Sequence, residues 1–466
     1  MDCLAVASKP ASRESEALHC LLEEAQQAEA DQSWDFAACL YQEALGLSPA
    51  NGELLLRAGN AFWFSDQPAE SLKIYRKAAQ ILPEMAGPYL GLGNALRDLN
   101  RFEEADRAFR TCRSLSDHPL GATNHASLLL GLECYPEAFE LAERRFDIPG
   151  YEGHRTPTPV GGPALPRALL LGDTLEQRKA SDPAAPECVV VWTEQGLGDI
   201  LQYLRWIPLL HQRLSPRGVA LVLEVEASLE RLVKHAFAQL NPALCVRSKG
   251  AVEDEGKQTA NIGLLSLPHW LGGAPCPGQP HSKTEYLRPA GWRERPWLER
   301  PPRIGITWAS GKKSSSAFQL REYRKRSLDQ SSLDRLVRGL HDLGCEVLAL
   351  QQGPDSERVE NCNVPLAGRL DPQGDFADTA EWIHSTDLVI SVDTSVAHLT
   401  GAVGHPGWIL LPWSADPRWL RDRSDTPWYS SLRLFRQPGS GEWEPVIEAV
   451  LQAARKQFTP ISTSWV

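Results

Sequence analysis

The sequence lacks several features that would define its class at once. Its 466 residues contain no run of about 20 apolar residues, so no transmembrane helix is expected. The first residues do not show the basic-then-apolar order of a secretory signal, and we expect a cytoplasmic protein. With 48 basic against 59 acidic residues, the net charge of −11 argues against an overall electrostatic attraction to nucleic acid or anionic membranes.

Common metal and nucleotide motifs are also missing. The ten cysteines form no CxxC pair, so they are expected to be reduced thiols without a zinc site. There is no GxxxxGK[ST] loop, no GxSxG elbow, no HExxH helix and no evident DxD bridge to a metal and a diphosphate. We therefore expect no metal and no cofactor. The 42% hydrophobic and 23% charged residues are typical of globular proteins, here with two to four domains.

The N-terminal third of the chain contains an internal repeat. The segment 41–49 (YQEALGLSP) recurs as 75–83 (YRKAAQILP) and, more faintly, as 109–117, each time 34 residues later. Gly59 and Gly93 follow the same 34-residue step. This period, with an aromatic residue, small residues and a closing proline, is typical of tetratricopeptide repeats.

The repeat predicts an all-α solenoid over residues 17–148, with about three and a half pairs of helices. A structural or dimerising solenoid and a groove that binds a peptide are equally compatible with this pattern. The sequence does not distinguish between the two.

Residues 149–187 form a linker rich in proline and glycine, after which the pattern changes. Short β-rich runs then alternate with helical stretches, which predicts parallel sheets with crossover helices. The simplest arrangement is two Rossmann-like α/β domains, over 188–290 and 302–458, with a ligand at the carboxyl ends of the strands. The expected strands are 188–192, 219–225, 303–308, 346–351, 388–392 and 407–411.

A glycine-rich turn, 194–199 (EQGLGD), follows the first expected strand. Gly196 and Gly198 permit a tight turn and the close approach of a ligand to the start of a helix. Asp199 lies where that helix begins. It could cap the helix, which the spacing alone favours, or act as a general base on an acceptor hydroxyl.

A second polar cluster follows the expected strand 388–392. Asp393, Thr394 and Ser395 fall at the start of a helix, where hydroxyl and backbone N–H groups suit a diphosphate. His398 lies on the same face as Thr394. A capping aspartate beside a half-buried histidine is the structural alternative, but the density of polar groups favours a ligand site.

Other donor-site candidates are less specific. The basic stretch 310–328 includes Lys312, Lys313, Lys325 and Arg326, and could form a loop that closes over phosphates, although such runs are usually solvated surface. Gln351 follows another strand and would fit a donor-binding loop. The aromatic loop 412–419 could line a sugar or base pocket or pack between domains.

These motifs together resemble the heptosyltransferase-like glycosyltransferase family 9, and more closely bacterial proteins that fuse tetratricopeptide repeats to such a module. The matching blocks are EQGLGD at 194–199, DTSVAH at 393–398, RSL at 326–328 and DFADT at 375–379. The resemblance implies a GT-B fold and sugar transfer from a nucleotide-sugar donor without a metal. It implies that Asp199 is the base and that Asp393, Thr394 and His398 hold the donor diphosphate. The basic loop departs from the family pattern, so several basic residues remain candidates for the phosphate contact.

The leading hypothesis is therefore a glycosyltransferase whose acceptor, such as a protein, is recruited by the repeats. Two alternatives remain. One is a scaffold for protein interactions whose GT-B module has lost catalysis, and the other is a GT-B-folded epimerase or hydrolase that acts on a nucleotide sugar. The sequence does not identify the sugar, the nucleotide, the acceptor or the oligomeric state.

Overall fold

The computed structural model describes most of the chain outside its two ends and the linker. The described residues are 13–151, 186–240, 244–250, 259–272, 285–289, 292, 300–311, 316–362, 364 and 375–458. Lys312, Lys313 and nearly all of the predicted linker lie outside them. Among these described segments, no helix has the length and apolar character needed to cross a membrane.

The chain divides into two compact units. The first is Met1–Leu128 together with Lys312–Lys325, and the second is Leu129–Gly311 together with Arg326–Val466. Each unit is described by itself below.

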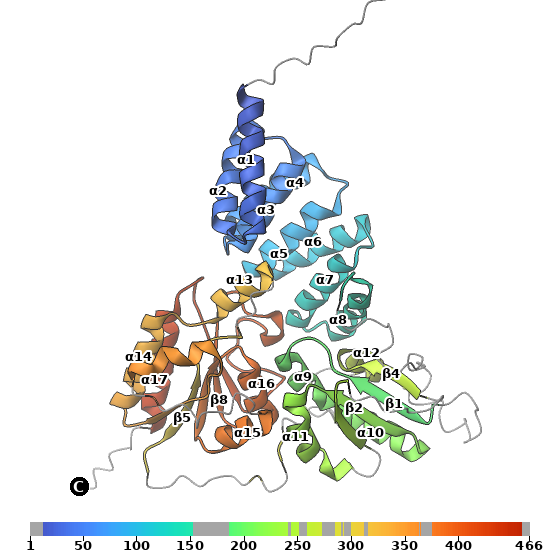
Figure 1. Cartoon of the computed structure of the whole chain (residues 1–466), viewed down its shortest axis with the longest axis vertical. Helices are drawn as coiled ribbons and strands as arrows, with labels where there is room; N and C mark the ends of the chain where they lie inside the picture. The colour runs from blue at the N-terminus through green and yellow to red at the C-terminus, as the bar shows by residue number, and fades with distance from the viewer. Residues whose placement is uncertain are drawn as a thin grey trace, which may run out of the picture. The chain divides into compact units, whose positions relative to one another are not determined.

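The N-terminal part is all-α, as predicted, and α1–α6 pack in sequence order against one another (Figure 1). Helices α3 and α5 begin 34 residues apart, as do α4 and α6. The helices are α1 (Arg13–Ala30), α2 (Trp34–Leu47), α3 (Gly52–Phe64), α4 (Pro68–Ile81), α5 (Ala86–Asp98), α6 (Phe102–Leu115), α7 (Pro119–Gly131) and α8 (Tyr135–Ala142).

The repeated residues explain how these helices approach one another. A Cβ atom on Gly59 would lie 2.7 Å from the ring of Tyr75, and one on Gly93 would lie 2.4 Å from the ring of Phe109. Each glycine therefore makes room for the aromatic ring of the next helix, and the two contacts are one repeat apart. The sequence signature is thus a packing requirement of the solenoid.

The rest of the chain contains two parallel sheets, which confirms the predicted α/β class. The first sheet has strand order β3-β2-β1-β4, and the second has the order β6-β5-β7-β8-β9. All the paired strands are parallel. The strands are β1 (Cys188–Trp192), β2 (Ala220–Val225), β3 (Leu244–Ser248), β4 (Thr259–Gly263), β5 (Arg303–Thr307), β6 (Glu346–Ala349), β7 (Leu388–Val392), β8 (Gly407–Leu411) and β9 (Leu432–Arg436).

Helices flank both sheets, because parallel strands are joined by crossovers that cover the sheet faces. In Figure 1, α14 and α17 lie on one side of the five-stranded sheet and α15 and α16 on the other. Strands β7 and β8 are buried along their whole length, which explains why their residues other than Ser391 are apolar or glycine. The helices are α9 (Leu197–Tyr203), α10 (Ile207–Leu214), α11 (Ala227–Ala236), α12 (Leu267–Leu271), α13 (Ala317–Arg326), α14 (Gln330–Asp342), α15 (Phe376–His384), α16 (Ser395–Ala402) and α17 (Trp443–Phe458).

The basic stretch after β5 differs from expectation. Residues 317–326 form helix α13 where we expected a loop. The segment contains no glycine or proline, and its Leu, Gln, Glu, Arg and Lys residues favour a helix. Up to Lys325, this segment belongs to the first unit, with α1–α6.

Candidate functional site

The glycine-rich turn of the first sheet leads from β1 into α9. Gln195 adopts a left-handed conformation with φ of 64°, and Gly196 is the N-cap of the helix. Asp199 is the third residue of α9, and its Oδ2 accepts a hydrogen bond from the Gly196 backbone N–H at 3.3 Å. Asp199 therefore does not cap the helix itself but supports the cap from within, as the acidic residue of a capping box does.

Glu194, the first residue of this motif, is a buried anchor that our sequence analysis did not assign. Its two carboxylate oxygens accept hydrogen bonds from Arg145 at 2.7 and 2.8 Å, and Oε2 also accepts one from the Tyr151 hydroxyl at 2.7 Å. Arg145 also donates to Ser266 at 2.8 Å. Burial opposes the charge of Arg145, but Glu194 reverses this and raises the pKa of the guanidinium. The pair fixes the turn to the segment that follows α8.

The second predicted cluster lies between β7 and α16. The N-cap is Thr394, whose side chain accepts from the Ala397 N–H at 3.4 Å, so the alternative of a capping Asp393 is wrong. Asp393 is instead buried, with its Oδ2 at 3.5 Å from Arg326 and its Oδ1 at 3.7 Å from Nε2 of His398. Burial raises the pKa of Asp393, and Arg326 opposes that shift.

His398 is enclosed by aromatic and charged neighbours. Its Nδ1 lies 2.9 Å from the Tyr429 hydroxyl, and its ring stacks on Trp419 with the centroids 5.2 Å apart. Burial, and then the positive charge of Arg418, lowers the pKa of His398 well below its usual value. The imidazole is therefore neutral at neutral pH and could offer an anion an N–H group but no charge. Trp419, from the aromatic loop, is completely buried.

The two motifs meet inside the second unit, although they are far apart in sequence. Helices α9 and α16 pack against each other. A Cβ atom on Gly198 would lie 2.8 Å from Cδ2 of His398, so Gly198 is the residue that allows the contact. Gly198 nevertheless stays partly exposed, so the ligand approach predicted for this position remains a prediction.

Arg418 completes this junction, and spacing alone gave no sign of its role. Its Nη1 lies 2.7 Å from Oδ1 of Asp199 and 2.8 Å from the side-chain oxygen of Gln202, and its Nε lies 3.0 Å from Asp416. Burial would raise the pKa of Asp416, but Arg418 outweighs it and lowers that pKa to about 2. Asp199 keeps 20% of its side-chain surface exposed. Both carboxylates remain partly accessible, since the Asp416 side chain is 32% exposed.

An open pocket lies at the carboxyl ends of β5, β6 and β7. Its empty volume, which includes open solvent, is about 530 Å³. It brings together three predicted donor-site residues, Thr394, Ser395 and Gln351. Its remaining lining residues are Thr307, Ala309, Gly311, Leu350, Gln352, Phe376, Thr379 and Val396.

The polar groups of this pocket are already partly organised. The Gln351 side-chain oxygen accepts from the backbone N–H groups of Trp308 and Ala309 at 3.1 and 3.0 Å, so Gln351 holds the end of β5 in place. The hydroxyl of Ser391 bonds to those of Thr307 and Thr394. These contacts orient hydroxyls toward the strand ends, where Rossmann-like domains bind ligands.

The predicted basic residues are distributed unevenly. Arg326 pairs with Asp393, directly before the pocket residue Thr394. Lys325 belongs to the first unit, where it pairs with Glu322 at 2.7 Å. Lys312 and Lys313 lie outside the described residues, so their predicted role is not tested. In the described part of the chain, no cluster of three or more His, Cys, Asp or Glu side chains could hold a metal.

Similar proteins include both kinds that the motifs predicted. The Protein FlbA of Caulobacter vibrioides is 25% identical over 97% of this chain and 72% of its own. The tetratricopeptide-repeat domain of Arabidopsis OM64 is 25% identical, covering 25% of this chain and 96% of its own, with a TM-score of 0.24. A glycosyltransferase family 9 structure from Veillonella parvula is 12% identical, covering 60% of this chain and 99% of its own, with a TM-score of 0.39. No family model matches the chain.

Proposed function

We propose that this protein transfers a sugar from a nucleotide-sugar donor to a hydroxyl group of an acceptor, without a metal ion. The observation that carries the proposal is the pocket at the ends of β5, β6 and β7. It combines the hydroxyls of Thr307, Thr394 and Ser395 with the N-terminal end of α16. Hydroxyls and free backbone N–H groups at such an end suit the oxygens of a diphosphate.

The charge on the leaving diphosphate needs a cation. Among the basic residues that the structure describes, Arg326 is the best-placed candidate for this role. Asp393 holds it next to Thr394, so Asp393 would position the guanidinium rather than touch the anion itself. His398 would then act behind the pocket, where it fixes the junction between α9 and α16 as a neutral ring. Lys312 and Lys313 remain candidates for a second phosphate contact.

Asp199 is the proposed base. Its carboxylate is partly exposed and is fixed in direction by Arg418 and by the Gly196 N–H. An oxygen fixed in this way retains a lone pair that can accept a proton from an acceptor hydroxyl. The acceptor could be a protein segment brought by the helical repeats.

Two matched substitutions test the role of Asp199. Asp199→Asn keeps an oxygen for the Gly196 N–H but removes the base, whereas Asp416→Asn removes the other carboxylate partner of Arg418 and leaves the base. The readout is release of nucleoside diphosphate from a panel of nucleotide sugars, with cell extract as the source of acceptor. We expect Asp199→Asn to lower kcat by about 10²–10⁴-fold and to leave donor affinity largely intact. We expect a much smaller loss of kcat for Asp416→Asn.

Equal losses in the two variants would mean that Asp199 acts only through Arg418, and would refute its role as the base. Turnover that gives a free or epimerised sugar in place of a glycosylated acceptor would support the hydrolase or epimerase alternative.

A second candidate function is donor binding without turnover, in a protein whose role is to hold partners together. The observation that favours it is that both oxygens of Asp199 already have structural contacts, at 2.7 Å with Arg418 and 3.3 Å with Gly196. This function would be supported if the protein binds a nucleotide sugar but forms no product with any fraction of the cell extract.

A further inference from the structure

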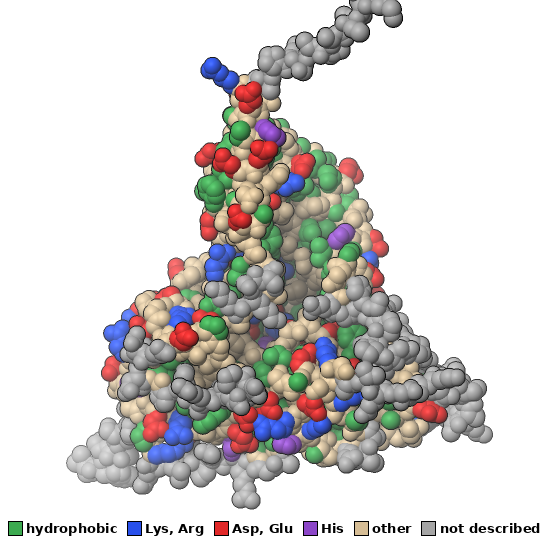
Figure 2. All heavy atoms as spheres, in the orientation of Figure 1, with side chains coloured by type: hydrophobic (Ala, Val, Ile, Leu, Met, Phe, Trp, Pro, Cys, Tyr) green, Lys and Arg blue, Asp and Glu red, His purple; other side chains and the backbone are tan. Residues whose placement is uncertain are grey.

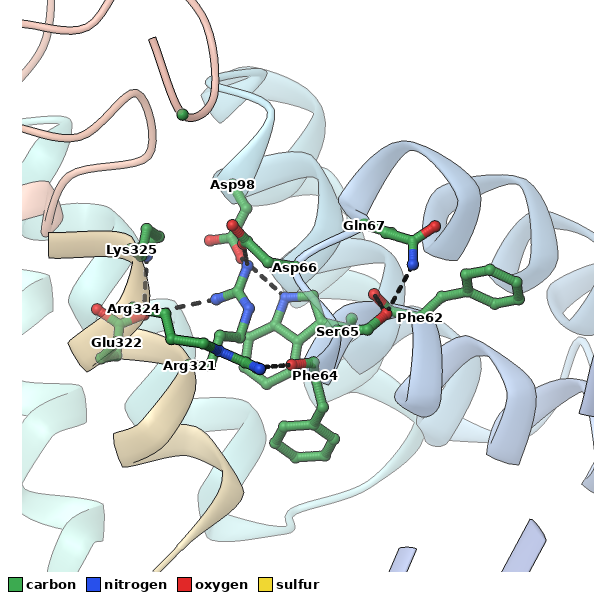
Figure 3. Close-up of polar contacts among 12 residues, drawn as sticks. Phe62, Phe64, Ser65, Asp66, Gln67, Asp98, Arg321, Glu322, Arg324 and Lys325 are labelled. Carbon is green, nitrogen blue, oxygen red and sulfur yellow. Dashed lines mark hydrogen bonds and ion pairs between the residues drawn. The ribbon is translucent and has the colours of Figure 1, made fainter. Parts of the chain in front are cut away.

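Helix α13 belongs to the C-terminal sequence but packs with helices of the first unit. It follows β5 in the chain, but its residues up to Lys325 form part of the first compact unit. Figure 3 shows α13 beside the helices that carry Phe62–Gln67 and Asp98. Arg321 is its only buried residue, and most of the other residues of the helix are polar or charged.

Arg321 lies beside Asp66 and Asp98 (Figure 3) and over the ring of Trp63, and we call this site the guanidinium pocket. Its Nη2 lies 2.8 Å from Oδ1 of Asp66 and 2.7 Å from Oδ2 of Asp98. Its guanidinium carbon lies 4.5 Å from the centre of the Trp63 ring. The Arg321 side chain is 0% exposed, and the Trp63 N–H donates to the same Asp98 oxygen at 2.8 Å. A planar cation is thus held by two carboxylates and an aromatic face.

The repeat fold alone does not require this pocket. Asp98 occupies a position where the two preceding repeats carry Phe64 and Ala30, one and two periods of 34 residues earlier. Asp66 lies in the turn between α3 and α4, with φ of 60°, where the next repeat has the uncharged Asn100, with φ of 57°. Two carboxylates therefore meet Trp63 at a single place in the solenoid. Figure 2 shows the other acidic side chains of α1–α4 scattered over the visible surface.

Asp98 needs a cation because a buried carboxylate without a partner is costly. Burial alone would raise the pKa of Asp98, but Arg321, with Lys325 and Arg97, lowers it below its usual range. Arg97 approaches the other oxygen only to 3.5 Å. The main counter-charge of this buried group thus comes from another part of the sequence.

Other contacts of α13 differ in their exposure. The Lys325 side chain, which is 9% exposed, pairs with Glu322 of the same helix at 2.7 Å. Phe318 stacks on Trp63 with centroids 6.1 Å apart and stays 48% exposed, and Arg324 is an exposed residue that donates to the Phe64 carbonyl at 3.2 Å. Apart from the Arg321 guanidinium, these contacts are exposed or lie within α13 itself, so the helix can leave without opening a hydrophobic core.

We propose that the guanidinium pocket is a binding site for an arginine presented on a helix, and that α13 is its built-in, releasable occupant. When α13 leaves, the site can bind an arginine on a helix of another molecule. Lys325 is joined directly to Arg326, which pairs with Asp393. Docking of α13 therefore restrains the backbone next to Arg326. The inference concerns the helical unit and does not depend on sugar transfer.

The first test is hydrogen–deuterium exchange of α13 in the whole protein. Arg321→Ala should increase exchange across 317–325 by at least about tenfold, whereas Arg324→Ala, on the same helix, should change it much less. If the single variant unfolds, the double variant Arg321→Ala/Asp98→Asn replaces it, because this variant also removes the buried Asp98 carboxylate. It should show the same fast exchange. Unchanged exchange of α13 without Arg321 would overturn the proposal.

The second test uses a fluorescent peptide with the sequence of residues 316–327, added to the whole protein. Wild type should bind it at least about tenfold more weakly than Arg321→Ala, because a tethered occupant competes at an effective concentration near millimolar. Binding to Arg321→Ala should be lost when the peptide carries Gln in place of Arg321, and when the protein also carries Asp98→Asn. Absence of binding to Arg321→Ala, or equal binding to all three proteins, would show that the pocket is not such a site.

Discussion

The contact between Gly198 and His398 allows a direct test of whether the two predicted motifs meet. An alanine at position 198 would place its Cβ 2.8 Å from Cδ2 of His398, closer than an ordinary contact. Overpacking of this kind costs about 1–3 kcal/mol, whereas a helical Gly→Ala change without a clash gains about 0.5–1 kcal/mol. We therefore expect Gly198→Ala to lower the free energy of unfolding by about 1–2 kcal/mol.

The sign of the effect should reverse when the histidine is removed. In a His398→Ala background the clash is absent, so Gly198→Ala should be neutral or stabilising, and the double-mutant cycle should give a coupling energy above about 1 kcal/mol. Urea denaturation followed by tryptophan fluorescence measures all four proteins. Gly46→Ala, in helix α2, has nothing within 4 Å of the new Cβ and is the matched control for helix propensity. A stabilising Gly198→Ala in wild type, or the same cost in both backgrounds, would refute the contact.

Two further predictions concern buried ionisable groups in the second unit. Arg145→Gln should destabilise the protein by about 3–5 kcal/mol, because it leaves the buried Glu194 carboxylate without its partner, whereas Arg144→Gln, at an exposed pair, should cost less than about 1 kcal/mol in the same denaturation assay. Burial, with His384 nearby, lowers the pKa of His405 to about 4 in the folded protein. The unfolded chain, with a His pKa of about 6.5, therefore binds a proton that the folded protein does not. The contribution of His405 to stability is complete above about pH 6.5 and is lost as the pH falls toward about 4. Stability should therefore fall by roughly 3 kcal/mol between those pH values from this group, and His405→Asn should flatten the profile; an unchanged slope would contradict the assignment.

Local sequence patterns predicted much of the fold because their physical causes are local. Gly59 and Gly93 repeat with Tyr75 and Phe109, since each aromatic ring needs a glycine beneath it. Strand β7 is apolar at four of its five positions because it is buried along its whole length. The strands β3, β4 and β9 were missed because they contain arginine, asparagine or threonine in place of an unbroken apolar run.

The parts of the site that sequence analysis missed depend on contacts between distant residues. Arg418 lies more than two hundred residues after its partner Asp199, and no spacing rule connects them. Arg145 and Glu194 lie on opposite sides of the linker. Helix α13 shows the same limit: its basic residues suggested phosphate binding, but the buried one pairs with Asp66 and Asp98. The sequence offered one sign of this pairing: Asp98 is acidic where the equivalent positions of the preceding repeats are apolar, Phe64 and Ala30.

The central claim is a metal-independent diphosphate site at the ends of β5, β6 and β7. A thermal-shift screen of nucleoside diphosphates and nucleotide sugars, with and without a chelator, tests it directly on wild type and on Thr394→Val. We expect a rise in Tm with one nucleotide class that survives chelation, since a ligand at about 100 times its Kd adds about 2.7 kcal/mol. The same ligand should give a much smaller rise with Thr394→Val. No shift with any ligand, or a shift that the chelator abolishes, would contradict the account.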